Sequence, residues 1–326
     1  MRKYDFEGNE AWTRQFGTTG SDGVFSLAVD ATGVYTGGTT NGTFPGQSSA
    51  GFSDAFVGKL DSGGGIVWIR QFGSAGRENL NGLAAYGTGV YAVGRTEDAL
   101  PGHTNVGADD GFVRKYDPSG VEAWTRQIGT EAGDTARAVF ANATGVYVAA
   151  GVGGTVTGTD VAGTGLIVVR KYDAGGNDVW TRRFGDATGF GTPMGITGDA
   201  TGLYLAGETS SYFTGLTSSA GGSDAFVAKL DYGGNLVWIN QIGSENTESG
   251  LGVAVGATDV YLAGDTDGTL PGQAGAGGRD GFLARFDKGT ATPNAAPVNT
   301  VPLVALSTSE SVALAVTGIS VADPDA

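Results

Sequence analysis

The residues best suited to chemistry in this chain are carboxylates set in a recurring pattern. Tyrosine returns at five similar places, and the residue four positions later varies: Thr39, Arg95, Gly151, Glu208 and Asp265. A polar position that varies inside a fixed pattern is where unequal side chains can be brought together. Glu208 and Asp265 could serve as the acid and base of glycoside cleavage. With Arg95, they are the candidate ligand-binding residues.

Other catalytic chemistries lack their essential residues. Cysteine is absent and His103 is the single histidine, so neither a thiol nucleophile nor a three-histidine zinc site can form. His103 stands in "LPGH" where other repeats carry Gln47 and Gln273, which indicates a surface-loop substitution. Solvated charges at strand ends are the simpler interpretation of the carboxylates. We therefore expect a protein that is not an enzyme, with carboxylate-dependent glycoside hydrolysis as the catalytic alternative.

Charge and hydropathy exclude two further classes of partner. The net charge of −15 argues against nucleic-acid binding, because phosphate recognition needs a basic surface. No apolar run approaches the ~18 residues of a membrane-spanning helix, so we expect no membrane insertion. The opening "MRKYDFEGNE" has no apolar core of a signal peptide.

A tandem repeat must position the candidate residues. The stretch "EAWTRQFG" at Glu10 returns with small changes four times, and each copy holds one of the five tryptophans: Trp12, Trp68, Trp124, Trp180 and Trp238. They are spaced by 56 residues three times and then by 58. Repeats of this length are typical of arrays in which each unit stacks on the next.

Each repeat is predicted to contain about four short antiparallel strands. "DAFVGKLD" alternates apolar and polar residues, a glycine-rich turn follows, and the tryptophan strand comes next. Stretches such as "VFSLAVDATGVYTGGTT" predict two more strands joined by a tight turn. Nothing has helical periodicity. The sequence therefore predicts an all-β fold, a β-propeller of four-stranded antiparallel blades.

The repeated phrase itself is best interpreted as packing. One four-stranded sheet cannot bury both faces alone, so neighbouring blades must stack, and one tryptophan per blade can act as the wedge between them. The arginines that follow are expected to pair with repeated carboxylates: Arg14, Arg70, Arg126 and Arg182.

The repeat resembles a known family. "GVYxxGxT", "FPGQ", "DAFVxKLD" and "GxxVWxRQFG" together resemble the bacterial SBBP repeats, which are named for a seven-bladed β-propeller, over roughly Met1 to Lys288. The resemblance implies a secreted or surface-exposed multidomain protein of bacterial type. It implies no defined molecular activity.

Counting strand types favours five blades. The tryptophan strand occurs five times and the "AKLD" strand six times, and Asn294 stands where a sixth tryptophan is due. We expect Glu10–Gly17 to complete the blade made by Gly250–Asp287, which would close the ring and hide sheet edges. The surplus "RKYD" at Arg2 suggests further repeats upstream.

Composition divides the chain into three parts. Residues 1–288 form the predicted propeller, 289–302 a Pro/Ala/Thr linker and 303–326 a shorter module. "NTVP" and "ISVADPDA" resemble the start of cadherin-like or Ig-like modules of bacterial surface proteins. That resemblance implies calcium ligation by Asp323 and Asp325, with Glu310 as a third ligand by analogy. Ca²⁺ is the one cofactor that the sequence suggests.

These features predict a non-enzymatic extracellular binding or scaffold module within a larger bacterial surface or secreted protein. Near-identical blades suit multivalent recognition, and by analogy with five-bladed lectins carbohydrate is the first expected ligand. Tyr212 and Tyr232 are candidate sugar-stacking rings that do not recur. A cell-surface protein partner, with the propeller as a structural scaffold, is the alternative. We expect the chain to be monomeric.

Overall fold

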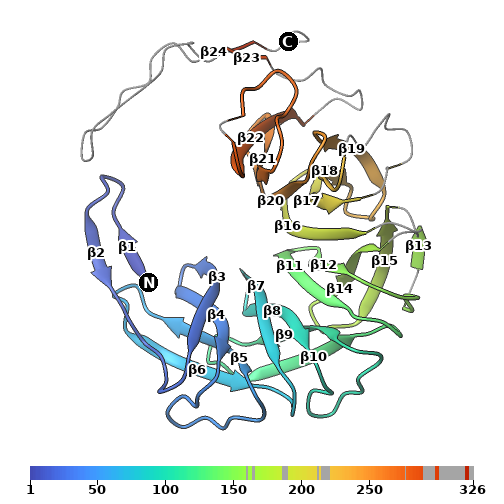
Figure 1. Cartoon of the computed structure of the whole chain (residues 1–326). Helices are drawn as coiled ribbons and strands as arrows, with labels where there is room; N and C mark the ends of the chain where they lie inside the picture. Colours follow the sequence, from blue (N-terminus) through green and yellow to red (C-terminus); the bar gives the residue numbers. More distant parts are fainter. Residues whose placement is uncertain are drawn as a thin grey trace.

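The fold consists of successive β-sheets. The computed structural model describes residues 1–158, 161–163, 166–185, 190–210, 213, 221–275, 277–288, 298–300 and 320–322. Within these ranges the chain forms strands and no helix (Figure 1). The described residues accordingly include no helix with the length and apolarity to cross a membrane.

Four sheets are complete, and each contains four antiparallel strands. The first sheet comprises β3 (Asp22–Asp30), β4 (Gly33–Thr40), β5 (Asp54–Leu60) and β6 (Ile66–Phe72). The second comprises β7 (Glu78–Tyr86), β8 (Gly89–Thr96), β9 (Asp110–Tyr116) and β10 (Glu122–Ile128). The third comprises β11 (Thr135–Asn142), β12 (Gly145–Gly151), β14 (Ile167–Tyr172) and β15 (Asp178–Phe184), and the fourth β16 (Gly191–Asp199), β17 (Gly202–Thr209), β18 (Asp224–Leu230) and β19 (Leu236–Ile242).

The two ends of the array hold partial sheets. At the start, β1 (Arg2–Tyr4) pairs with β2 (Glu10–Thr13), and these two correspond to the third and fourth strands of a complete sheet. At the end, β20 (Glu248–Val255), β21 (Asp259–Thr266) and β22 (Asp280–Asp287) correspond to the first three.

Two additions depart from the repeat. In the third sheet β13 (Val161–Gly163) pairs in parallel with the outer edge of β15. Beyond the array, β23 (Val298–Thr300) pairs with β24 (Ser320–Ala322). The strand β23 lies within the range predicted as a linker.

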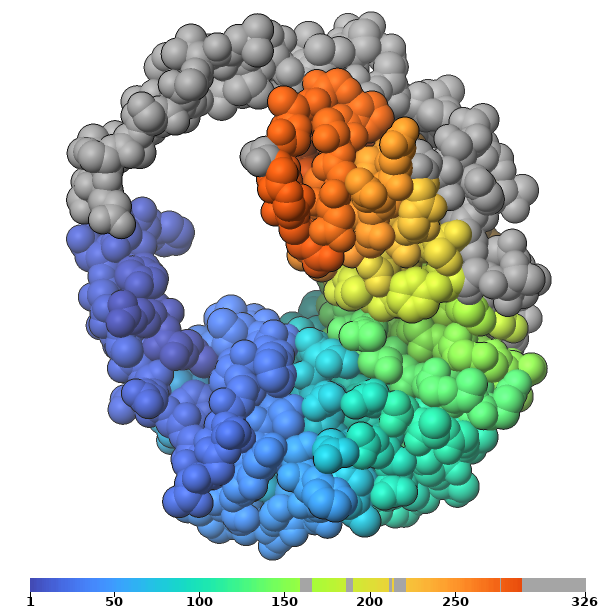
Figure 2. All heavy atoms as spheres, in the orientation of Figure 1, coloured from blue at the N-terminus to red at the C-terminus, as the bar shows by residue number. Residues whose placement is uncertain are grey.

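The predicted all-β fold of four-stranded antiparallel sheets is confirmed. The sheets follow one another around an arc, with first strands β3, β7, β11, β16 and β20 nearest the centre, as in the blades of a propeller (Figure 1). The predicted closure is not found: among the described strands β2 pairs with β1 and not with β22. The local hairpin prevails because β1 precedes β2 by a tight turn, so little loop entropy is lost. Figure 2 shows open space between the N-terminal hairpin and the last sheet.

A tight turn built on aspartate joins the third and fourth strands of each sheet. In the second sheet the Asp117 carboxylate accepts hydrogen bonds from the backbone N–H groups of Ser119 at 2.8 Å and Val121 at 2.9 Å. Gly120 has φ +82°, a left-handed conformation that favours glycine. Asp5, Asp61, Asp173 and Asp231 occupy the same position in the other turns.

The repeated tryptophan joins each sheet to the next through this turn. Trp68 of β6 donates a 3.1 Å hydrogen bond from Nε1 to the Pro118 carbonyl, which belongs to the second sheet. A Cβ on Gly120 would lie 2.7 Å from Trp68 Cδ2, so only a glycine admits the ring. The indole also lies between Tyr35 and Tyr116, both 6.1 Å away by centroid.

The contact of a tryptophan with the glycine turn or third strand of the next sheet, which we call a joint, recurs along the array. Trp12 and Trp124 bond the corresponding carbonyls of Ser62 at 3.0 Å and Ala174 at 3.1 Å. Trp180 packs over Gly234, and Trp238 packs beside Phe286 of the last sheet. The tryptophans therefore lie between sheets, and the main apolar clusters likewise span consecutive sheets.

The arginine of the repeated phrase binds backbone rather than the expected carboxylates. Arg14, Arg70 and Arg126 each donate from Nε to the glycine carbonyl of the next turn, at 2.6, 2.7 and 2.7 Å. The guanidinium of Arg70 also lies 5.6 Å from the Trp68 ring centroid. The turn holds this carbonyl oxygen in a fixed position beside the tryptophan. A carboxylate on a flexible side chain would have to be ordered before it could accept the same hydrogen bond.

The glutamine that follows anchors a loop of its own sheet. Gln71 Nε2 donates to the buried Asp54 carboxylate at 2.6 Å, and its Oε1 accepts from the Phe44 backbone N–H at 2.9 Å. Gln127 repeats this arrangement with Asp110 at 2.8 Å. The recurring tryptophan, arginine and glutamine of the "WTRQ" phrase thus each make a structural contact.

Replacing Gly120 by alanine should test the joint. The positive φ alone costs about 1–2 kcal/mol, and the clash with Trp68 should add about 1–3 kcal/mol. Gly8 has the same turn position and φ +86°, with no atom within 4 Å of the place that a methyl group would take. In urea unfolding we expect Gly120→Ala to lose about 1–3 kcal/mol more than Gly8→Ala. In a Trp68→Ala background this excess should vanish, and its persistence would contradict the contact.

The pair Asp199–Lys288 gives a pH signature to the last joint. Lys288 Nζ lies 2.6 Å from Asp199 Oδ2. Burial acts to raise the pKa of Asp199, but hydrogen bonds from Lys288 and Thr201 outweigh it and lower the pKa to about 2. Because the folded pKa lies below the unfolded value of 3.8, this pair stabilises the fold above about pH 4 and the contribution is lost as pH falls toward 2.

A Lys288→Met variant should reveal this dependence in thermal melts between pH 2 and 6. The Tm difference between wild type and variant should be constant above pH 5 and shrink below pH 4. A difference that stays the same down to pH 2 would show that Lys288 contributes by packing alone.

Candidate functional site

The variable positions after the repeated tyrosines lie at equivalent places in the sheets. They stand at or next to the last residue of each second strand, opposite a first strand. Arg95 pairs in register with Asn79, Glu208 with Thr192 and Asp265 with Ser249. Because first strands are nearest the centre of the arc (Figure 1), these positions flank its inner side.

Each of the three predicted ligand-binding residues already has a protein partner. Arg95 Nη1 lies 2.8 Å from Asp109 Oδ2. Glu208 accepts a 2.6 Å hydrogen bond from Ser249 Oγ in the next sheet.

Asp265 lies 3.7 Å from Arg279 Nη1, and Arg279 Nε also lies 2.8 Å from Asp267. The two carboxylates proposed as an acid–base pair are thus engaged in an inter-sheet hydrogen bond and an ion pair.

A second set of variable residues was missed by the sequence reasoning. Every first strand has a β-bulge at the same place, and the extra residues are Phe25, Asn81, Arg137, Met194 and Leu251. A bulge re-aims a side chain and often lies next to a functional site. The available signal was a variable residue between recurring apolar positions when the five repeats are aligned.

Arg137 brings the predicted residues into one electrostatic row. It is half-buried, and burial lowers its pKa; the charge of Arg95 lowers the pKa further, while Glu208 opposes this. Its Nε is buried and has no hydrogen-bond partner in the described part of the chain. Arg279 in turn feels the charges of both Asp265 and Glu208. Charges from four sheets therefore act on one another, with the like charges of Arg95 and Arg137 next to each other.

The expected calcium ligands fall outside the described residues: Glu310, Asp323 and Asp325. Within the described ranges no group of three His, Cys, Asp or Glu residues could hold a metal ion. Of the two candidate stacking rings, Tyr212 also lies outside the description. Tyr232 is half-buried, donates its hydroxyl to the Asp199 carbonyl and packs 5.6 Å from Tyr147, so it presents no exposed platform.

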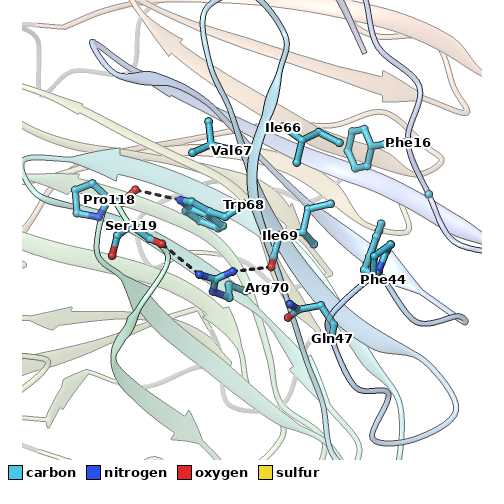
Figure 3. A pocket seen from close by; sticks show the side chains of 12 residues that line it. Phe16, Phe44, Gln47, Ile66, Val67, Trp68, Ile69, Arg70, Pro118 and Ser119 are labelled. Carbon is cyan, nitrogen blue, oxygen red and sulfur yellow. Dashed lines mark hydrogen bonds between the residues drawn. The ribbon is translucent and has the colours of Figure 1, made fainter.

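A groove lies at the outer side of the joint between the first and second complete sheets (Figure 3). Its volume is about 700 Å³, and it is lined by Phe16, Gly17, Phe44, Pro45, Gln47, the strand segment 66–70, Pro118 and Ser119. The exposed apolar side chains Ile66 and Val67 form one wall. An apolar surface beside a few polar groups is the usual composition of a ligand site.

The walls of this groove are held by hydrogen bonds rather than by flexible loops. Trp68 bonds Pro118 as described above, and Arg70 Nη2 donates to the Ser119 carbonyl at 3.3 Å (Figure 3). Gln47 Oε1 accepts from the Gln71 backbone N–H at 3.1 Å. The groove is therefore preformed, and sequence reasoning could not find it because two sheets build it.

Apolar side chains at the start of the outer strand recur in other sheets. Val179 in the third sheet and Leu236 and Val237 in the fourth are exposed there, as Ile66 and Val67 are in the first sheet. The outer rim of the arc thus repeats part of the groove wall.

Arg137→Met should separate electrostatic strain from structural support. Methionine keeps the aliphatic contacts and removes the unpartnered Nε and the repulsion from Arg95. We expect the free energy of unfolding to rise by about 1 kcal/mol, measured by urea denaturation. Asp109→Asn, which removes the partner of Arg95, should lower it. A loss of stability in Arg137→Met would show that the charge is satisfied in the native state.

Comparisons with known proteins give distant matches. The sequence matches no protein-family model. It is 25% identical over 337 residues to the regulatory protein FlaEY of Caulobacter vibrioides, covering 89% of this chain and 35% of that protein. The chain thus spans about a third of the length of this relative. Among solved structures it is similar to an exo-1,5-α-L-arabinanase from a bovine ruminal metagenomic library, with 9% identity, a TM-score of 0.29 and coverage of 84% of this chain and 96% of that one.

Proposed function

We propose that this chain is a non-enzymatic binding or scaffold module of a bacterial secreted or surface protein, with carbohydrate as its ligand class. The observation that carries the proposal is the preformed groove of about 700 Å³ at the first joint. Sugar rings have apolar C–H faces that suit Ile66 and Val67, and hydroxyl groups that suit Gln47, Arg70 and the Ser119 backbone.

Recurrence of the rim supports multivalent binding. The exposed apolar residues Val179 of the third sheet and Leu236 and Val237 of the fourth repeat one wall of the groove. Weak sites on one rigid array combine through effective concentration, so modest single-site affinity suffices.

The engagement of the inner carboxylates supports binding rather than catalysis. Glu208 is held by Ser249 and Asp265 by Arg279, so both carboxylates already have partners within the protein. The Caulobacter relative is described as a regulatory protein, which also supports a binding role. The surface or secreted location rests on the resemblance to SBBP repeats.

A glycan array, run once with Ca²⁺ and once with chelator, tests the ligand class. We expect selective binding by wild type and at least a tenfold loss of affinity in Val67→Asp, because a charge would be buried against the apolar ligand face; tenfold corresponds to about 1.4 kcal/mol. Val106→Asp places the same charge at an exposed valine outside the groove and should bind like wild type.

The outcomes separate the alternatives. Loss of binding in chelator alone would assign Ca²⁺ a part in recognition. A blank array from cooperatively folded protein would overturn the carbohydrate ligand and leave a protein-binding scaffold. Hydrolysis of a glycan that is lost in both Glu208→Gln and Asp265→Asn would overturn the non-enzymatic role.

A further inference from the structure

The arginine in the outer groove carries a positive charge that no carboxylate of the described residues neutralises. Arg70 donates from Nε to the Gly120 carbonyl at 2.7 Å, from Nη1 to the Ile69 carbonyl at 3.0 Å and from Nη2 to the Ser119 carbonyl at 3.3 Å. All three acceptors are backbone oxygens without a net charge. They satisfy N–H donors of the guanidinium, but they supply no counter-ion.

Arginines outside the repeated phrase behave differently. Those that form ion pairs with carboxylates are Arg2, Arg77, Arg95, Arg114, Arg170, Arg279 and Arg285. The chain holds 34 acidic residues against 19 lysines and arginines, so carboxylates are in excess. The absence of an ion pair at Arg70 within the described ranges therefore results from its place in the joint and not from a shortage of partners.

The remaining donors of Arg70 are available to a ligand. A guanidinium has five N–H donors, and the three hydrogen bonds leave one free N–H on each of Nη1 and Nη2. The half-buried side chain lines the groove together with Gln47, Trp68 and Ser119 (Figure 3). Two N–H groups on neighbouring nitrogens match the two oxygens of a carboxylate.

The carboxylate beside this wall of the groove is bound to its own turn. Asp117 accepts hydrogen bonds from the backbone N–H of Ser119 at 2.8 Å, from the Ser119 hydroxyl at 2.7 Å and from the backbone N–H of Val121 at 2.9 Å. It forms no ion pair with Arg70. The positive charge thus faces the groove without an acidic group of the described residues bound to it.

We propose that the groove selects acidic carbohydrate, in which the carboxylate of a uronic acid unit binds Nη1 and Nη2 of Arg70. This inference rests on the carbohydrate ligand proposed above and adds the chemical class of the sugar. The apolar C–H face of the sugar ring would lie on Ile66 and Val67, which form the other wall.

The same cation recurs at the next joint, which favours a polymer with an acid on successive units. Arg126 donates to the Gly176 and Thr125 carbonyls, both at 2.7 Å, and lies 5.6 Å from the Trp124 ring centroid. Within the described part of the chain it too forms no ion pair. Equivalent contacts on one rigid array combine through effective concentration.

The net charge of −15 is compatible with such a ligand. A nucleic acid needs a continuous basic surface, whereas one carboxylate needs only one guanidinium. At 0.15 M salt the repulsion between distant charges is screened beyond about 8 Å. Contacts inside the groove therefore decide the selectivity.

Two ligands that differ only in charge test the inference on the whole chain. One is a labelled hexamer of galacturonic acid, and the other is the same hexamer with every carboxyl group methylated. Binding is followed by fluorescence anisotropy in 0.15 M NaCl with chelator, so that Ca²⁺ cannot bridge ligand and protein. We expect the acid to bind at least tenfold more tightly than the ester.

The ratio of the two affinities is the decisive quantity in the variants. Gln47→Glu keeps an acceptor for the Gln71 backbone N–H and places a negative charge in the groove with Arg70, so the preference for the acid should fall at least tenfold. Arg70→Met should abolish the preference, and melting temperatures show whether its joint remains folded. Val106→Asp adds the same charge outside the groove and should keep the wild-type ratio.

Each outcome decides between the two levels of the proposal. Equal binding of acid and ester would support a carbohydrate ligand and overturn the selection of acidic sugars. The same holds for a preference that persists in Gln47→Glu, since a merely structural role of these residues would weaken both ligands alike. No binding of either hexamer would overturn the uronic acid ligand, and the glycan array then decides separately whether the chain binds another sugar.

Discussion

The contact of each tryptophan with a glycine of the next sheet is the constraint on which the remaining structure depends. A four-stranded sheet cannot bury both faces by itself, so its stability comes from neighbours. Trp68 lies directly over Gly120, and Trp12 over Gly64 in the same way. Any larger residue at these turns would push the indole away. The repeat length follows, because every unit must bring a glycine turn back to the tryptophan of the unit before it.

This constraint also explains which residues recur in every repeat and which residues vary. Tryptophan, arginine and glutamine of the repeated phrase are all committed to the joint or to a loop anchor. The residues free to vary lie at the bulges and at the ends of second strands, and there the charges of Arg95, Arg137 and Glu208 meet across three sheets. The outer groove differs from these inner positions. Its polar walls are formed by residues of the joint, and the part of their surface that is not used in the joint faces solvent.

Much of the fold could be predicted from the sequence because the strands follow from local periodicity. Alternation, glycine turns and the tryptophan spacing indicate the strands and their grouping. What failed depends on contacts between distant residues. Arg70 was expected to pair with a carboxylate, but it donates to the Gly120 carbonyl. A pattern of side chains in the sequence does not reveal a backbone acceptor. The bulge at Arg137 and the groove at Val67 depend on register and on the neighbouring sheet. The predicted ring closure by Glu10–Gly17 is not found, because β1 is the nearer partner of β2.

Burial of a side chain in this array depends on the neighbouring sheet as well as on the repeated sequence. Leu83 is buried because the sheet before it is complete, whereas Leu27 has the same type and position and has no such neighbour among the described residues. Exposed edges and apolar faces favour association, and here part of the edge carries charge: Arg2 and Lys3 lie on β1. Charge on an edge discourages unspecific pairing, so these two residues protect the part of the edge on which they lie.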